Sequence, residues 1–227
     1  MKYLIWDFDG TLGYRTEGWT PVLTRLVQQA IVGSPITVEQ LRPYLSKGFP
    51  WHDYMTPHTQ IHSAEEWWNM IEPLFVNGLL QCGVNDELAR TFAGQIRHIY
   101  PKTEYWSLYD DVIPALQNLS AKGWTHILLS NHIPELSLIL AHLQVDRHFV
   151  RIFNSAETGY EKPHPQAYKN VIGFIGSGAT AWMIGDNINA DVRGAEAAGL
   201  PAILVRKENT DAKYFSLDVA GVARIVE

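Results

Sequence analysis

Two aspartates stand one residue apart at the end of an apolar run near the start of the chain. The stretch LIWDFDGTLG covers residues 4–13, and Asp7 and Asp9 follow the apolar letters LIW. An Asp-Gly turn would account for Asp9 and Gly10. It does not account for Asp7, because a buried strand is normally apolar up to its end. Two carboxylates in this place can supply a nucleophile, a general acid or base, or ligands for a metal.

Polar residues follow three later apolar runs in the same way. Ser130 and Asn131 follow THILL, Lys162 stands in EKPHP, and Asp186 and Asp191 belong to GDNINAD after the run AWMI. In an open parallel sheet, ligands bind at the carboxyl ends of the strands. We therefore expect these side chains to meet the first two aspartates at one edge of a sheet.

The collected residue types suit a metal ion together with a phosphate. Four carboxylates that converge without a cation repel one another. Mg2+ prefers oxygen ligands and is typically bound by one or two carboxylates and a substrate phosphate. A phosphate also accounts for Lys162, for Ser130, and for the helix expected after Ser130, whose amino end favours an anion. The pattern indicates a magnesium and phosphate site.

Strands and helices that could position these residues alternate along most of the chain. Short apolar runs predict buried strands at 3–6, 125–129, 149–153, 181–184 and 202–205. Helical patterns cover 111–123, 133–143, 165–176 and 189–199. This alternation predicts an α/β fold built on a doubly wound parallel sheet with helices on both faces.

A long helical insertion separates the first strand from the second. Helices are predicted at 21–32, 37–45, 63–80 and 85–100. A connection of about ninety residues is too long for a plain loop within a compact sheet. We expect an all-helical module at 14–105, inserted into a core that consists of 1–13 and 106–227.

Composition excludes several classes of protein. The chain has 227 residues, a hydrophobic content of 46% and a net charge of -6, without the basic clusters that nucleic-acid binding requires. Cys82, the one cysteine, cannot form an intramolecular disulfide and is interpreted as an apolar filler. No run approaches the roughly 20 apolar residues of a membrane span. We expect a cytoplasmic protein whose partner is a small molecule; the oligomeric state is not predicted.

The four motifs occur in the order found in a known family. DFDGT (Asp7 to Thr11), LLSN (128–131), Lys162 in EKPHP, and GDNINAD (185–191) resemble the motifs of the haloacid dehalogenase-like superfamily. The resemblance covers residues 1 to about 13 and about 106 to the end. It implies a Rossmann-like core, and the insertion resembles the helical cap of members whose cap follows the first motif.

The resemblance implies a role for each matching residue. Asp7 would be the nucleophile and a metal ligand, and Asp9 would be the general acid and base, with its main-chain carbonyl on Mg2+. Lys162 would be catalytic and, with Ser130, would hold the phosphoryl oxygens. The remaining assignments are Gly10, Thr11 and Asn131 at the phosphate, Asp186 as the second carboxylate ligand, and Asp191 near the metal, through water or by orienting Lys162.

The implied reaction is Mg2+-dependent hydrolysis of a small phosphomonoester through an aspartyl-phosphate. Asp9 favours phosphoester chemistry, since members that split carbon-halogen bonds lack this second carboxylate. A sugar-phosphate mutase uses the same residues and differs mainly in how its cap excludes water. A catalytically silent binding protein on this fold is a third possibility, against which the complete residue set argues.

The insertion contains an aromatic segment, KGFPWHDYMTPHTQIHSAEEWW, at 47–68. Trp51, His52 and Tyr54 are expected to face the site and to influence specificity; the alternative is that they only pack the cap. His52, His58 and His62 make a poor metal site, because their spacing spans a proline and no acidic or thiol partners accompany them.

Overall fold

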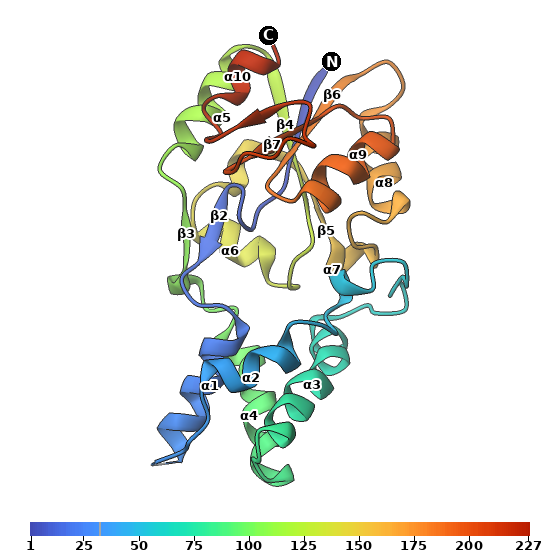
Figure 1. Cartoon of the computed structure of the whole chain (residues 1–227). Coiled ribbons are helices and arrows are strands. Elements are labelled where there is room, and N and C mark those ends of the chain that lie inside the picture. The colour runs from blue at the N-terminus through green and yellow to red at the C-terminus, as the bar shows by residue number, and fades with distance from the viewer. Residues whose placement is uncertain (32) are drawn as a thin grey trace.

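A six-stranded parallel sheet forms the core of the protein in the computed structural model, which describes residues 1–31 and 33–227 (Figure 1). The strand order is β5-β4-β1-β6-β7-β8, and every neighbouring pair is parallel. The strands are β1 (Lys2–Trp6), β4 (Trp124–Ser130), β5 (Phe149–Asn154), β6 (Thr180–Gly185), β7 (Ala202–Val205) and β8 (Phe215–Ser216). The predicted α/β fold with a parallel sheet is confirmed.

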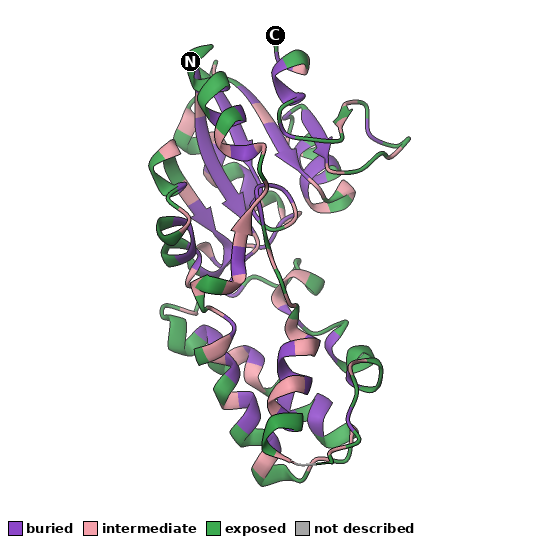
Figure 2. Ribbon diagram, turned by 90° about the vertical axis from the view of Figure 1, so that its left-hand side faces the viewer, coloured by how far each residue is buried: buried purple, intermediate pink, exposed green. Residues whose placement is uncertain are grey.

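The first strand lies in the middle of the sheet and is buried on both faces. In β1, Ile5 stands opposite Ile127 of β4 on one side and Met183 of β6 on the other. Leu4 and Trp6 pack into one hydrophobic cluster and Ile5 into a second, as the alternation of side chains along a strand requires. The inner strands β1, β4, β6 and β7 are accordingly buried along most of their length (Figure 2), which explains their continuous apolar runs in the sequence. The edge strands β5 and β8 are exposed or half-buried along most of their length, so the prediction of a buried strand at 149–153 is wrong for most of β5.

Helices cover both faces of the sheet. The cluster that contains Trp6 includes residues of α5 (Val112–Ala121), α6 (Leu136–His142) and α10 (Val222–Ile225). The cluster that contains Ile5 includes residues of α8 (Pro165–Ile175) and α9 (Gly194–Ala197). A short helix, α7 (Ser155–Thr158), follows β5. The predicted helix 189–199 is instead a π-helical turn, Ile188–Arg193, followed by α9.

Four helices make up the insertion and lie together at one end of the molecule (Figure 1). They are α1 (Trp19–Ala30), α2 (Val38–Leu45), α3 (Ala64–Gln81) and α4 (Asp86–Ile99). Thr37, Ser63 and Asn85 cap the last three through hydrogen bonds from backbone amides, which accounts for the predicted starting points. The first helix begins two residues before the predicted start, and Val32, its predicted last residue, lies outside the described residues.

Two short strands connect the helical insertion to the sheet. β2 (Gly13–Arg15) pairs antiparallel with β3 (Trp106–Leu108), and Arg15 stands opposite Trp106. The sequence did not predict this pair, because strands of three residues are too short to show a periodic pattern. The domain boundaries at 13 and 106 remain a prediction.

Three single 3-10 turns complete the elements: Pro50–His52, Thr103–Tyr105 and Asp146–His148. Across residues 1–31 and 33–227, each helix is either too short or too polar to traverse a lipid bilayer.

Candidate active site

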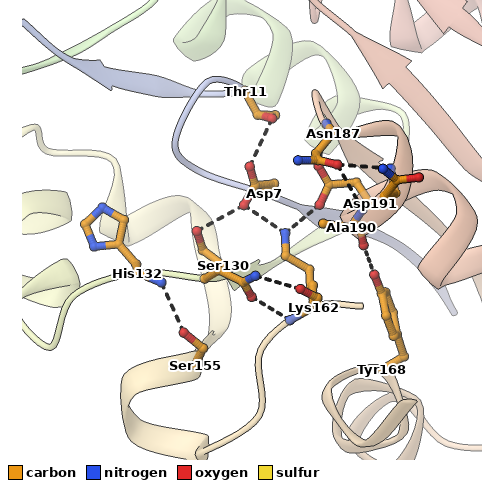
Figure 3. Close-up of polar contacts among 12 residues, drawn as sticks. Asp7, Thr11, Ser130, His132, Ser155, Lys162, Tyr168, Asn187, Ala190 and Asp191 are labelled. Atoms are coloured by element: carbon orange, nitrogen blue, oxygen red, sulfur yellow. Dashed lines mark hydrogen bonds and ion pairs between the residues drawn. The ribbon is translucent and has the colours of Figure 1, made fainter. Parts of the chain in front are cut away.

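Asp7 lies directly after β1, at the carboxyl edge of the sheet, and is almost fully buried. Its Oδ1 accepts hydrogen bonds from Ser130 Oγ at 3.0 Å and from Lys162 Nζ at 2.8 Å, and its Oδ2 accepts from Thr11 Oγ1 at 3.3 Å (Figure 3). Three donors from three segments therefore hold one carboxylate. The structure brings these four predicted residues together.

A tight turn follows Asp7, and it requires glycine at position 10. Gly10 has φ +83°, and a Cβ atom there would lie 2.9 Å from Cγ of Asp186. The turn is closed by bonds from the amide of Gly10 to the carbonyl of Gly13 and from the amide of Leu12 to the carbonyl of Phe8. The chain thus bends away from the sheet while it passes close to Asp186.

Lys162 is buried and is held at three points. Its Nζ donates to Asp7 and, at 2.6 Å, to Oδ1 of Asp191. Asn131 fixes the backbone: its Oδ1 accepts from the amide of Lys162 at 2.6 Å, and its Nδ2 donates to the carbonyl of Lys162 at 2.8 Å. The predicted phosphate residue Asn131 therefore positions Lys162 in this structure.

The charge of Lys162 is maintained by its two carboxylate partners. Burial by itself lowers the pKa of Lys162, but the negative charges of Asp191 and Asp7 raise it, and the net shift is upward. The ammonium group is consequently a permanent positive charge beside Asp7. Such a charge can hold the oxygens of a phosphoryl group.

Asp186 and Asp191 follow β6 and complete the acidic cluster. Carboxylate oxygens of Asp7, Asp186 and Asp191 all lie within 4.8 Å of one another. Burial, and next the charge of Asp7, raise the pKa of Asp186. A set of oxygen donors whose charges repel in this way fits a hard cation such as Mg2+. Both oxygens of Asp191 are already engaged, one by Lys162 and one by the amide of Asn187.

Three residues that sequence reasoning missed shape this part of the site. A Cβ atom on Gly185 would lie 2.2 Å from Cγ of Asp191, so only glycine lets the aspartate fold back against the strand. The side chain of Asn187 caps the π-helical turn that carries Asp191. Lys207 Nζ donates to Oδ2 of Asp186 at 3.1 Å. Gly185 and Asn187 lie within the GDNINAD motif, whereas no local signal points to Lys207.

Asp9 is set apart from the acidic cluster and faces the pocket beside it. Its side chain is exposed to the pocket, and the protein atoms around the pocket partly desolvate its carboxyl group. This partial burial, and then the charges of Asp7 and Asp186, raise the pKa of Asp9 to about 7. A carboxyl group with a pKa near neutrality can both donate and accept a proton.

A pocket of about 1170 Å³ lies between the sheet edge and the helical insertion. Asp7, Asp9, Lys162, Asp186 and Asp191 line its core end. All three predicted specificity residues, Trp51, His52 and Tyr54, line the pocket as well. The structure thus places the two predicted residue sets around one cavity.

A contact between His58 of the insertion and Glu161 of the core lies next to Lys162 in the chain. His58 Nε2 lies 3.6 Å from Oε1 of Glu161, both side chains are buried, and the amide of His58 donates to the carbonyl of Gly159 at 3.0 Å. Burial raises the pKa of Glu161 to about 8 and lowers the pKa of His58. At neutral pH the two groups therefore meet uncharged.

The raised pKa of Glu161 predicts a stability that depends on pH. Between pH 4.5 and pH 8 the folded protein keeps a proton on Glu161 that the unfolded chain has released. The contribution of Glu161 to the free energy of unfolding is therefore highest below pH 4.5 and falls as the pH rises toward 8. Glutamine does not ionise. The Glu161→Gln variant should therefore gain stability relative to the parent as pH rises, by at most about 1.4 kcal/mol per pH unit.

Urea unfolding at pH 5, 6.5 and 8 measures this difference. The control is Glu104→Gln, since Glu104 is an exposed residue of the insertion, and its difference from the parent should be the same at all three pH values. A difference for Glu161→Gln that does not change with pH would contradict the prediction.

Comparison with known proteins agrees with the motifs. The sequence profile of the haloacid dehalogenase-like hydrolases matches residues 1–199. The glyceraldehyde 3-phosphate phosphatase of Methanothermobacter thermautotrophicus is 26% identical over 98% of this chain and 93% of its own length. The phosphoserine phosphatase of Thermus thermophilus is 31% identical over 68% of this chain and 61% of its own length.

Solved structures share the whole fold at low identity. The 2-haloacid dehalogenase of Pseudomonas syringae pv. tomato superposes with a TM-score of 0.69 at 18% identity, covering 100% of this chain and 98% of the other. The Thermococcus onnurineus HAD phosphatase gives a TM-score of 0.63 at 20% identity, with 100% and 98% covered. With the four motifs gathered at one sheet edge and the profile match over most of its length, the chain belongs to the family of haloacid dehalogenase-like hydrolases.

Proposed function

We propose that the protein is a Mg2+-dependent phosphatase that hydrolyses a small phosphomonoester through an aspartyl-phosphate. The carrying observation is the buried carboxylate of Asp7, which accepts hydrogen bonds from Ser130, Thr11 and Lys162, with Asp9 on the same pocket wall. The similarity to two curated phosphatases supports phosphoester chemistry.

Asp7 and Asp9 divide the work between nucleophile and proton carrier. A carboxylate oxygen of Asp7 attacks phosphorus, the bond from phosphorus to the ester oxygen breaks, and Asp9 gives its proton to the departing alkoxide. Water then attacks the phosphorus of the aspartyl-phosphate, Asp9 takes a proton from that water, and the bond between phosphorus and the Asp7 oxygen breaks. Inorganic phosphate leaves, and both aspartates return to their starting states.

The donors around Asp7 would bind the phosphoryl oxygens during both steps. Lys162 supplies a fixed positive charge, and Ser130 and Thr11 supply hydroxyl groups within 3.3 Å of the Asp7 carboxylate. Donors that are already in place stabilise the charge on the equatorial oxygens without reorganisation. Asn131 contributes indirectly, because it fixes the backbone of Lys162.

The residues for a metal are Asp7, Asp186 and the main-chain carbonyl of Asp9. When bound, Mg2+ would neutralise part of the charge on the phosphoryl group. Asp191 would act through Lys162, since its two oxygens are engaged by that lysine and by the amide of Asn187.

Phosphate release from p-nitrophenyl phosphate tests the proposal. We expect turnover that depends on Mg2+ and stops when EDTA is added. The Asp186→Asn variant should need roughly 10- to 100-fold more Mg2+ for half-maximal activity, because a charged ligand is lost. Asp86→Asn is the control, since Asp86 is exposed on α4 and pairs only with Arg90 among the described residues.

An unchanged Mg2+ requirement in Asp186→Asn would contradict the assigned metal site. Phosphate transferred to a second alcohol, with none released to water, would identify a mutase instead.

A further inference from the structure

The side of the pocket formed by the helical insertion is an aromatic wall. Six tryptophan, tyrosine and phenylalanine side chains line the pocket: Trp19, Phe49, Trp51, Tyr54 and Tyr100 from the insertion, and Trp106 where the chain returns. Among the described residues of 14–105, no aspartate, glutamate, lysine or arginine lines the pocket. Ser46 and His52 line this side as well. Binding here therefore depends on apolar contact, on ring faces and on neutral polar groups.

These aromatic rings form flat, mutually supported surfaces. Phe49 and Trp51 stack with their ring centroids 4.8 Å apart and their planes 3° from parallel. Trp19 and Tyr100 stack at 3.4 Å, also 3° from parallel. Trp51 and Trp19 stay partly exposed at the pocket. Each can offer ring surface to a ligand, and stacking behind the ring limits its freedom to rotate away.

The two cationic side chains that line the pocket, Lys162 and Arg193, are already engaged. Lys162 is bonded to Asp7 and Asp191, and Arg193 pairs with Asp211 at 2.7 Å. Arg15 does not line the pocket; it donates to the carbonyls of Tyr100 and Glu17, and its guanidinium lies over the rings of Tyr100 and Tyr105. Its Nη2 has no hydrogen-bond partner among the described residues.

A leaving group that carried its own negative charge would meet no lysine or arginine among the described residues that line the aromatic side. It would also lie in the same pocket as Asp9, Asp186 and the other carboxylates at the core end. Placing an unpaired charge in such an environment is costly. The wall therefore disfavours esters with a carboxylate or a second phosphate.

We infer that the substrate is a phosphomonoester with an uncharged aromatic leaving group, and that Trp51 is a specificity-determining residue that stacks on it. This inference rests on the proposed phosphatase function and extends it to the class of substrate. Phe49 holds the Trp51 ring from behind, and the phosphoryl group of the same substrate lies at Asp7 and Lys162.

A matched series of alkyl esters tests the substrate class without changing the basicity of the leaving group greatly. The series consists of ethyl phosphate, 2-phenylethyl phosphate and phosphoglycolate. We expect kcat/KM for 2-phenylethyl phosphate to exceed that for ethyl phosphate by at least about tenfold, because the ring is buried against the wall. Phosphoglycolate should be at least about tenfold poorer than ethyl phosphate, because its carboxylate is unpaired.

Substitution of Trp51 tests the residue itself. Trp51→Ala should lower kcat/KM for 2-phenylethyl phosphate to near the value for ethyl phosphate, so that the preference for the aromatic ester is lost. Trp51→Phe should retain most of the preference, because a ring remains. Tyr44→Ala is the matched control, because Tyr44 is partly exposed on α2 and does not line the pocket. This substitution should leave kcat/KM unchanged for both esters.

The outcomes separate this inference from the function on which it rests. Hydrolysis of ethyl phosphate and phosphoglycolate at rates equal to that of 2-phenylethyl phosphate would overturn the aromatic substrate class and leave the phosphatase assignment standing. No hydrolysis of any ester, p-nitrophenyl phosphate included, would overturn the function. Equal losses on both alkyl esters in Trp51→Ala and Trp51→Phe would show a structural role for Trp51 and overturn its role in specificity.

Discussion

The Asp7→Asn variant is expected to lose at least about 10³-fold in kcat, which corresponds to roughly 4 kcal/mol of transition-state stabilisation. The amide has nearly the shape of the carboxylate and keeps one acceptor oxygen, which can serve Ser130 or Thr11 but not both, because these hydroxyls donate to different oxygens of Asp7. The amide oxygen is a poor nucleophile. The variant should bind substrate and fail in the first chemical step.

Two measurements distinguish a variant that cannot carry out the first chemical step from a variant that does not fold. A single-turnover experiment should trap a phosphorylated protein in the parent, detectable by mass, and none in Asp7→Asn. Thermal unfolding shows whether the variant is folded at the assay temperature. Asp86→Asn on the surface of α4 should behave as the parent in both experiments. A phosphorylated Asp7→Asn protein, or a rate within tenfold of the parent, would rule out Asp7 as the nucleophile.

Lys162→Met is expected to cost about 3–5 kcal/mol of folding stability in addition to its effect on activity. Lys162 is 2% exposed and bonds to Asp7 and Asp191, so methionine fills much of the space but leaves two neighbouring carboxylates without their cation. The loss should be larger at high pH. Without the lysine, burial and the charge of Asp7 raise the pKa of Asp191 further, opposed only by the hydrogen bond from the amide of Asn187. The folded variant then holds a proton on Asp191 that the unfolded chain releases once the pH exceeds the ordinary aspartate pKa of about 4.

Urea unfolding of Lys162→Met at pH 5 and pH 8 measures the loss of folding stability and shows whether that loss grows or shrinks with pH. The control is Lys122→Met, which breaks an ion pair with Glu227 at the surface and should cost no more than about 1 kcal/mol at either pH. Lys162→Met as stable as Lys122→Met would mean that the buried charges are compensated in another way. A loss that grows toward low pH would contradict the assigned titration.

Sequence reasoning succeeded where the chemistry leaves a local pattern. The continuous apolar runs before Asp7 and Ser130 required strands buried on both faces, and β1 and β4 lie in the interior of the sheet. Gly10 after two aspartates indicated a turn, and its φ of +83° needs glycine. These features depend on neighbours in the chain, so a short window of sequence contains the information.

Other features depend on segments that meet only after folding. Asn131 bonds to both backbone groups of Lys162, and His58 of the insertion packs against Glu161, yet nothing near any of these residues in the sequence indicates a partner. The three-residue strands β2 and β3 also stabilise each other across the insertion. Such pairings are decided by tertiary packing, which a local pattern does not contain.

The pairing of β2 with β3 brings the two ends of the insertion together at one place on the core. Arg15 and Trp106 are Cα partners in an antiparallel pair, so the chain leaves for the helices and returns at neighbouring points, separated by only about 5 Å. An insertion whose ends lie side by side can lengthen, shorten or be exchanged without moving a strand of the sheet. Evolution, or a protein engineer, can therefore vary the aromatic wall while the catalytic edge stays the same.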